Sequence, residues 1–215
     1  MRNRLFAWIT SVVVLAGCSS TYYGIWQKFG YEKRDILVSR VEKARDAQKD
    51  AKEEFKTTFQ KFQDLTHFQG GDLEAKYKKL SSAYDSCKSR SDEVKTKIDS
   101  VEKVASDMFS EWGQELKSYE NQDLRRQSEQ KLRDTRERFK QLLAAMRASE
   151  QKMYPVLRAF NDQVLFLKHN LNAQAISSLS TTSAEIEQDV QKLIADMESS
   201  IKEADQFIGQ MKSEK

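Results

Sequence analysis

The chain has 215 residues, of which 32% are charged and 39% hydrophobic, with only seven glycines and one proline. Few helix breakers among many Lys, Glu, Gln, Arg and Ala residues is the composition of long helices. Two of the 36 basic residues lie in 1–17, which leaves 34 basic against 33 acidic residues in the rest. This near-neutral balance gives no electrostatic basis for binding nucleic acid, and we expect no nucleic-acid partner.

The first eighteen residues have the order of an export signal. Arg2 and Arg4 precede an apolar run over 5–15, which is followed at once by Leu-Ala-Gly-Cys at 15–18. A run of 11 residues is well short of the roughly 20 that span a bilayer. The ending resembles the lipobox of bacterial lipoproteins, which implies cleavage before Cys18 and lipid on its sulfur and new amine. The alternative is an ordinary signal with a chance cysteine.

The resemblance also implies an address. Asp after the lipidated cysteine favours inner-membrane retention in Gram-negative lipoproteins, whereas Ser19 and Ser20 stand here. We therefore expect an outer-membrane lipoprotein that faces the periplasm. The predicted division is a signal peptide over 1–17, a lipidated tether over 18–30 and a single helical domain over 31–215.

The tether is crowded with aromatic residues, which a free linker would lack. They are Tyr22, Tyr23, Trp26 and Phe29, with Tyr31 just beyond. So close to a lipid anchor, such rings could lie at headgroup depth. Packing under the end of the helical domain is the equally weighted alternative.

The first helix is predicted over 31–67 and the second over 72–119. Apolar or small residues recur in both at alternating steps of four and three, the heptad pattern of a coiled coil or bundle helix. In the first helix they are Leu37, Val41, Ala44, Gln48, Ala51, Phe55, Thr58, Phe62 and Leu65. Gly70-Gly71 should stop the first helix and Asp72 should cap the second. At Trp112 one step of four residues is followed directly by a second step of four. Such a stutter locally unwinds a supercoil.

A turn at 120–123, with Asp123 as a cap, is predicted to start the third helix at Leu124. This helix should run to Leu171, with a kink at Pro155. Its apolar run 160–171 covers more than one face, which indicates burial among several helices. The last helix could start at Ala173 after an Asn172 cap, or at Ser183 in a capping box of Thr182 and Glu185.

Short connections make sequential helices antiparallel neighbours. The fold class predicted is therefore all-α, an elongated antiparallel four-helix bundle or coiled coil with up-down-up-down order. Cys87 falls on the apolar face of the second helix. We interpret it as a small buried hydrophobe, with a reactive thiol or an intermolecular disulfide as alternatives.

Two separated stretches carry a family resemblance. They are the runs from Lys33 to Gln48 (KRDILV, RVE, ARDAQ) and from Val164 to Ala173 (VLFLKHNLNA). Together they resemble a family of bacterial envelope proteins known as domain of unknown function 2959. The family has no established activity. Some members carry a label suggesting a DNA-repair ATPase, but this chain has no Gly-x-x-x-x-Gly-Lys-Ser/Thr phosphate loop.

The leading functional hypothesis is a non-enzymatic spacer, scaffold or partner-binding module held to a membrane by Cys18. No cofactor is expected besides that covalent lipid, and no catalytic or metal-binding cluster is recognisable. The alternative is an envelope enzyme, or an activator of one, with an unrecognised site of perturbed carboxylates or histidines. A third hypothesis, a protein lying on the lipid surface, fits poorly because the polar faces are balanced in sign.

In an up-down bundle the first and third helices end on the side away from the anchor. His67, His169, Asn170 and Asn172 should therefore share one apex, just above the apolar run. Three interpretations stand: a hydrogen-bonded polar turn, a docking apex for a protein partner of unknown identity, and a metal site. The metal site lacks a visible third ligand.

Overall fold

The computed structural model describes residues 33–68 and 70–213, and over these ranges it contains helices and no strand. The elements are α2 (Lys33–Thr66), α3 (Leu73–Glu115), the 3₁₀ turn η1 (Leu116–Ser118), α4 (Gln122–His169) and α5 (Ala173–Ser213). The predicted all-α class is confirmed. The predicted signal peptide, the tether and Cys18 lie outside the described residues. None of the described helices is apolar enough, over a sufficient length, to cross a membrane.

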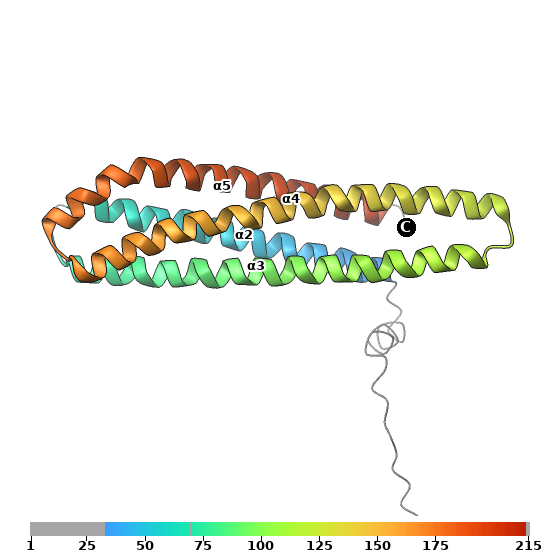
Figure 1. The fold of residues 1–215 in the computed structure, drawn as a ribbon, viewed down its shortest axis with the longest axis horizontal. Coiled ribbons are helices and arrows are strands. Elements are labelled where there is room, and N and C mark those ends of the chain that lie inside the picture. The colour runs from blue at the N-terminus through green and yellow to red at the C-terminus, as the bar shows by residue number, and fades with distance from the viewer. Residues whose placement is uncertain (1–32, 69, 214–215) are drawn as a thin grey trace, which may run out of the picture.

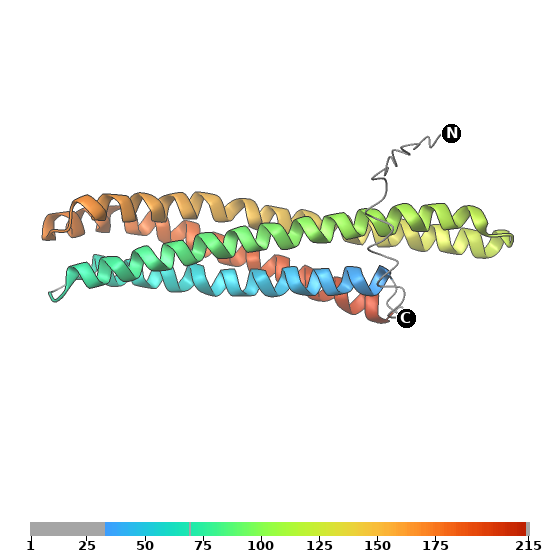
Figure 2. The same ribbon diagram turned by 90° about the horizontal axis from the view of Figure 1, so that it is seen from below.

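The helices form an elongated structure in which each long helix packs against two others. α2 lies against α3 and α5, and α4 lies against the same two helices. Consecutive helices run in opposite directions (Figures 1 and 2). The α2–α3 and α4–α5 turns therefore lie at the same end, which we call the apex and define as residues 66–68, 70–73 and 165–173. The 48 residues of α4 give a length of about 70 Å.

The heptad pattern accounts for the core. All nine patterned residues of the first helix are buried in α2. In α4 the pattern is buried from Leu132 to Leu167, and in α5 from Ile186 to Met211. Phe55 and Phe160, both fully enclosed, stack across the core with ring centroids 6.4 Å apart. The pattern thus selects the inward face of each helix.

A polar layer interrupts this core near its middle. Gln48, Ser149 and Ser200, from α2, α4 and α5, have no exposed area. Gln48 Nε2 donates to Ser149 Oγ at 3.4 Å, and Ser200 Oγ donates to Gln48 Oε1 at 3.1 Å. A hydrogen-bonded polar residue at one seam position disfavours slipped registers, because a slip would leave its polar atoms buried without partners.

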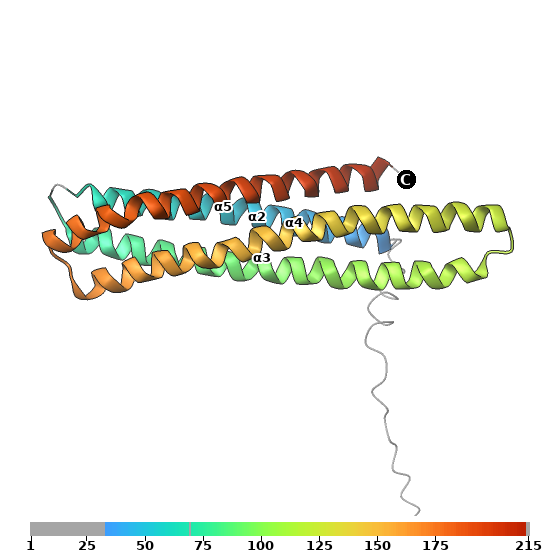
Figure 3. The same cartoon turned by 45° about the horizontal axis from the view of Figure 1, so that its top comes forward.

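Helices α3 and α4 extend past the other two (Figures 1 and 3). At the start of α2, Lys33 pairs with Glu111 of α3, and Arg34 donates to the Met211 carbonyl near the end of α5. The section with four helices therefore ends near the level of Glu111. Beyond it, residues 112–132 form a two-helix hairpin, which we call the hairpin tip.

The first turn follows the sequence prediction. Gly70 and Gly71 have φ of 136° and 108°, a region that glycine adopts without a Cβ clash. The side chain of Asp72 then accepts from Ala75 N at 2.9 Å, which confirms the predicted cap of α3.

The turn at the hairpin tip differs from the prediction. Asn121, rather than Asp123, caps α4, because its Oδ1 accepts from both Asp123 N at 2.9 Å and Leu124 N at 3.1 Å. α4 consequently starts at Gln122, two residues before the predicted start, and Asp123 lies in the first helical turn. The stutter after Trp112 coincides with the end of α3 at Glu115 and the tightening into η1.

The structure of the α4–α5 connection shows which of the two predicted starts of the last helix is used. Asn172 Oδ1 accepts from Ala175 N at 2.9 Å, and α5 begins at Ala173. Thr182 lies inside the helix, where its hydroxyl donates to the Leu179 carbonyl at 3.1 Å, so it caps nothing. Pro155 lies inside α4, which continues to His169 without a break.

Candidate functional site at the apex

The two histidines lie at the C-terminal ends of α2 and α4. His67 follows α2 directly and is exposed, with Nδ1 lying 2.9 Å from the carbonyl of Gln63 one turn earlier. His169 is the last residue of α4 and is also exposed. The two helices that precede these histidines, α2 and α4, do not pack against each other over an extended surface. Across the described residues, no group of three His, Cys, Asp or Glu side chains is arranged to hold a metal ion.

The two asparagines build the α4–α5 turn through local hydrogen bonds. Asn170 Nδ2 donates to the Phe166 carbonyl at 2.9 Å, and its backbone N–H donates to Leu167 at 3.2 Å. Asn172 N–H donates to the Asn170 carbonyl at 2.9 Å, while its side chain caps α5. These bonds satisfy backbone groups that a helix end leaves open. They supply a stable support for the side chains around them.

Three large apolar side chains remain exposed beside this turn. Leu165 is 48% exposed, Phe166 40% and Leu171 38%. The expected burial of the whole 160–171 run among several helices is therefore wrong. Phe160, Val164 and Leu167 follow the heptad pattern and are buried, whereas Leu165 and Phe166 fall between its positions and face away. The heptad spacing was the signal that could have separated Leu165 and Phe166 from the buried residues. Leu171 fits the spacing but lies beyond the end of α4.

The stretch from the α4–α5 turn into α5 differs from the rest of the chain in charge. Residues 170–184 contain no Asp, Glu, Lys or Arg, although these make up 32% of the chain. The segment presents Asn, Gln, Ser and Thr instead, and most of these are exposed. An uncharged polar surface around exposed apolar side chains costs less to desolvate than a charged one. This composition suits a contact surface.

The most connected ionic cluster lies between α3 and α4 and serves packing. Arg147 of α4 donates to Asp99 at 2.7 Å, to Glu102 at 2.6 Å and to Glu150 at 2.8 Å. The Lys95 ammonium, and then Arg147, hold the pKa of Asp99 below its usual range. Burial, followed by the nearby Glu150 carboxylate, raises the pKa of Tyr154, whose hydroxyl donates to Glu150 at 3.2 Å. Each carboxylate of this cluster accepts a hydrogen bond from a cation or a hydroxyl group. The cluster therefore holds α3 and α4 together, and we call it the interhelical clamp.

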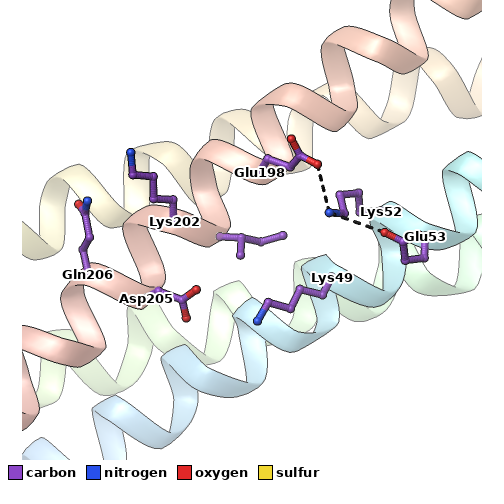
Figure 4. Close-up of a pocket in the computed structure, with 8 residues that line it drawn as sticks. Lys49, Lys52, Glu53, Glu198, Lys202, Asp205 and Gln206 are labelled. Atoms are coloured by element: carbon purple, nitrogen blue, oxygen red, sulfur yellow. Dashed lines mark hydrogen bonds and ion pairs between the residues drawn. The ribbon is translucent and has the colours of Figure 1, made fainter.

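A second candidate binding site is a groove between α2 and α5 (Figure 4). Lys52 closes part of it by pairing with Glu198 at 3.2 Å and Glu53 at 3.6 Å. Lys49 and Lys202 line the groove but point in different directions. Their ammonium groups do not converge on one point, so the groove has no centre for an anion.

Cys87 is buried in α3, as interpreted from its place in the pattern. Its Sγ lies 3.1 Å from Thr58 Oγ1, and the Thr58 hydroxyl also donates to the Ala83 carbonyl at 3.2 Å. Burial raises the pKa of the thiol to about 12. Since the thiolate is the reactive form, the folded protein keeps this cysteine inert.

These features define an elongated, all-helical protein in which the Arg147 cluster joins α4 to α3. Its exposed large apolar side chains gather at two places, Tyr119 and Leu124 in the hairpin tip and three at the apex. Residues 22–211 match the family described as protein of unknown function (DUF2959), and the chain belongs to this family. No curated protein and no solved structure matches the chain.

Proposed function

We propose that this protein is a non-enzymatic, lipid-anchored spacer of the bacterial cell envelope that presents its apex to a protein partner. In this proposal Cys18 carries the lipid, and an up-down-up-down four-helix bundle rises from the outer membrane into the periplasm. The observation that carries it is the placement of Leu165, Phe166 and Leu171. They stay exposed at the end of the bundle opposite the start of α2, the helix that follows the tether.

The rest of the apex supports the same function. The turn that holds these side chains is fixed by its own hydrogen bonds through Asn170 and Asn172. A surface that is ordered before binding loses less conformational entropy on docking. A bundle about 70 Å long would hold this surface far from the anchor, which is the property that a spacer needs.

The anchor is tested by Cys18→Ser. The variant should lose lipidation and leave the membrane fraction, while the wild-type protein should band with the outer membrane in a sucrose gradient. A variant that fractionates with membranes as tightly as the wild type would refute the lipid anchor. Wild-type protein in the inner-membrane band would refute the proposed outer-membrane location.

The apex is tested by Leu165→Ser with Phe166→Ser. Crosslinking in intact cells followed by pull-down should yield a partner with the wild type and lose it with this variant. Tyr119→Ser with Leu124→Ser is a matched control, because it removes exposed apolar side chains from the opposite end. Equal capture by both variants would mean that the apex is not the docking surface. Circular dichroism should show the same helicity and melting temperature for all three proteins.

A further inference from the structure

The hairpin tip lies on the same side of the protein as the point where the tether enters the fold. α2 begins at Lys33, beside Glu111 of α3 and Met211 of α5. From Glu111, α3 and η1 continue to Ser118, which extends the hairpin roughly 10–15 Å past the start of α2. Figures 1 and 2 show α3 and α4 reaching beyond the other two helices at this end.

We propose that the hairpin tip is a second, non-covalent membrane contact that rests on the lipid surface into which Cys18 is inserted. The inference depends on the proposed lipid anchor. Fifteen peptide steps separate Cys18 from Lys33, so the start of α2 lies at most about 50 Å from the anchored residue. The projection of the tip is well within this reach. When the bundle stands on the membrane, the tip is therefore the first folded part to meet it.

The side chains at the tip suit a shallow contact with headgroups. Tyr119 is 38% exposed and Leu124 is 51% exposed, on either side of the turn. A tyrosine ring with its polar hydroxyl is stable at the depth of the headgroups, and the exposed leucine beside it gains by removing apolar area from water. Tyr119 directly follows η1 and Leu124 lies in the first turn of α4, and neither α2 nor α5 extends far enough to cover them.

The balance of charges at the tip indicates which headgroup charge it would contact. Residues 112–132 hold four acidic and four basic side chains. Several of these pair with each other, as in Arg126 with Asp123, and Arg125 with Glu129 at 3.0 Å. A balanced, internally paired surface gains little from an anionic membrane. The contact is therefore to zwitterionic headgroups and should be insensitive to salt.

Two exposed side chains are enough because the anchor supplies the proximity. A contact too weak to hold a free protein becomes occupied when a tether keeps its local concentration high. Together, the lipid and the tip would fix two points on the membrane. The bundle would then stand with its apex directed away from the surface.

The test uses the full, lipidated protein in phosphatidylethanolamine–phosphatidylglycerol vesicles. An environment-sensitive fluorophore is attached at Ser118→Cys in the tip, or at Ser180→Cys in exposed α5 near the apex as a control. Cys18 is blocked by its lipid and Cys87 is buried, so only the new thiol reacts. The label at 118 should shift to the blue and be quenched by lipids with headgroup-region nitroxides. The label at 180 should do neither.

A second comparison isolates the apolar side chains. Tyr119→Ser with Leu124→Ser should abolish the response at 118, while Leu165→Ser with Phe166→Ser should leave it unchanged. The response should also persist in 1 M salt, where surface charge attraction is screened to about 3 Å. Loss of the response in salt would refute the zwitterionic contact.

The remaining outcomes separate this inference from the proposed function. If the protein floats with the vesicles but the label at 118 behaves as in water, the anchor stands and the tip contact is wrong. If the label at 118 is shielded without nitroxide quenching and crosslinks to a second copy, the tip is a self-association surface and the inference fails. If the protein does not float with vesicles at all, both the anchor and the inference fail.

Discussion

Two parts of helix α4 share one sequence pattern and differ in burial. Leu142 in the four-helix section is 1% exposed, whereas Leu124, 18 residues earlier on the same helix face, lies in the hairpin tip and is 51% exposed. The difference lies in the neighbours, since α2 and α5 flank the section around Leu142 but end before Leu124. A heptad pattern thus specifies which face of a helix is apolar, and the lengths of the other helices decide whether that face is covered.

The largest expected effect comes from truncating one apolar side chain in the four-helix section and one in the hairpin tip. Phe55→Ala in the four-helix section should lower the free energy of unfolding by about 3–5 kcal/mol, because it opens a cavity against Phe160. Leu124→Ala in the hairpin tip should change it by less than about 0.5 kcal/mol. Urea unfolding followed by circular dichroism measures both. Similar losses for the two variants would show that the tip is covered in solution.

The polar layer should give the next largest effect. Gln48→Ala should cost about 1–3 kcal/mol, because the hydroxyls of Ser149 and Ser200 lose their buried partner. Gln114→Ala, which changes an exposed glutamine in the hairpin tip, is the matched control and should be neutral. Replacing the whole layer with Gln48→Leu, Ser149→Ala and Ser200→Ala should restore most of the unfolding free energy. A triple variant as unstable as Gln48→Ala would contradict the hydrogen-bond account.

The helix caps compare the apex with the hairpin tip directly. Asn172→Ala and Asn121→Ala each remove an N-cap, worth about 1 kcal/mol. At the apex the loss should appear in global stability, because Ala175, Ile176 and Leu179 in the first turns of α5 are buried. At the tip it should appear mainly as faster amide exchange near Leu124, since a two-helix end can open locally. Exchange that accelerates equally at all amides in both variants would refute this distinction.

The smallest effect is a pH dependence in the clamp between α3 and α4. Because the pKa of Asp99 is lowered in the folded protein by Lys95 and Arg147, its stabilisation is present above the ordinary Asp pKa of about 4. It is lost as the pH falls through the lower folded value. Between pH 5 and 3 the wild type should lose more stability than Asp99→Asn, by under about 1 kcal/mol for this exposed pair. Denaturant midpoints at the two pH values provide the measurement, and equal losses would remove Asp99 from the clamp.

Local chemistry in the sequence was enough to locate most helix ends. Gly70 and Gly71 need positive φ and Asp72 offers a cap, so this turn could be read directly. Asn121 and Asp123 are both good caps two residues apart, and propensity alone does not rank them. The choice between Asn172 and Thr182 was open for the same reason. In each case the hydrogen bonds of the folded chain show which side chain caps the helix.

The sequence by itself determined that the chain is helical and which face of each helix points inward, because both depend on local propensity and on a repeating apolar spacing. It also contains the run Leu-Ala-Gly-Cys at 15–18, whose resemblance to a lipobox is the basis of the proposed anchor. The tertiary structure decided which apolar residues stay exposed. Leu165 and Phe166 remain exposed because no helix lies over that side of α4, and Tyr119 and Leu124 because α2 and α5 are shorter than their neighbours. Burial requires a partner surface, and no single helix encodes the length of the helices beside it.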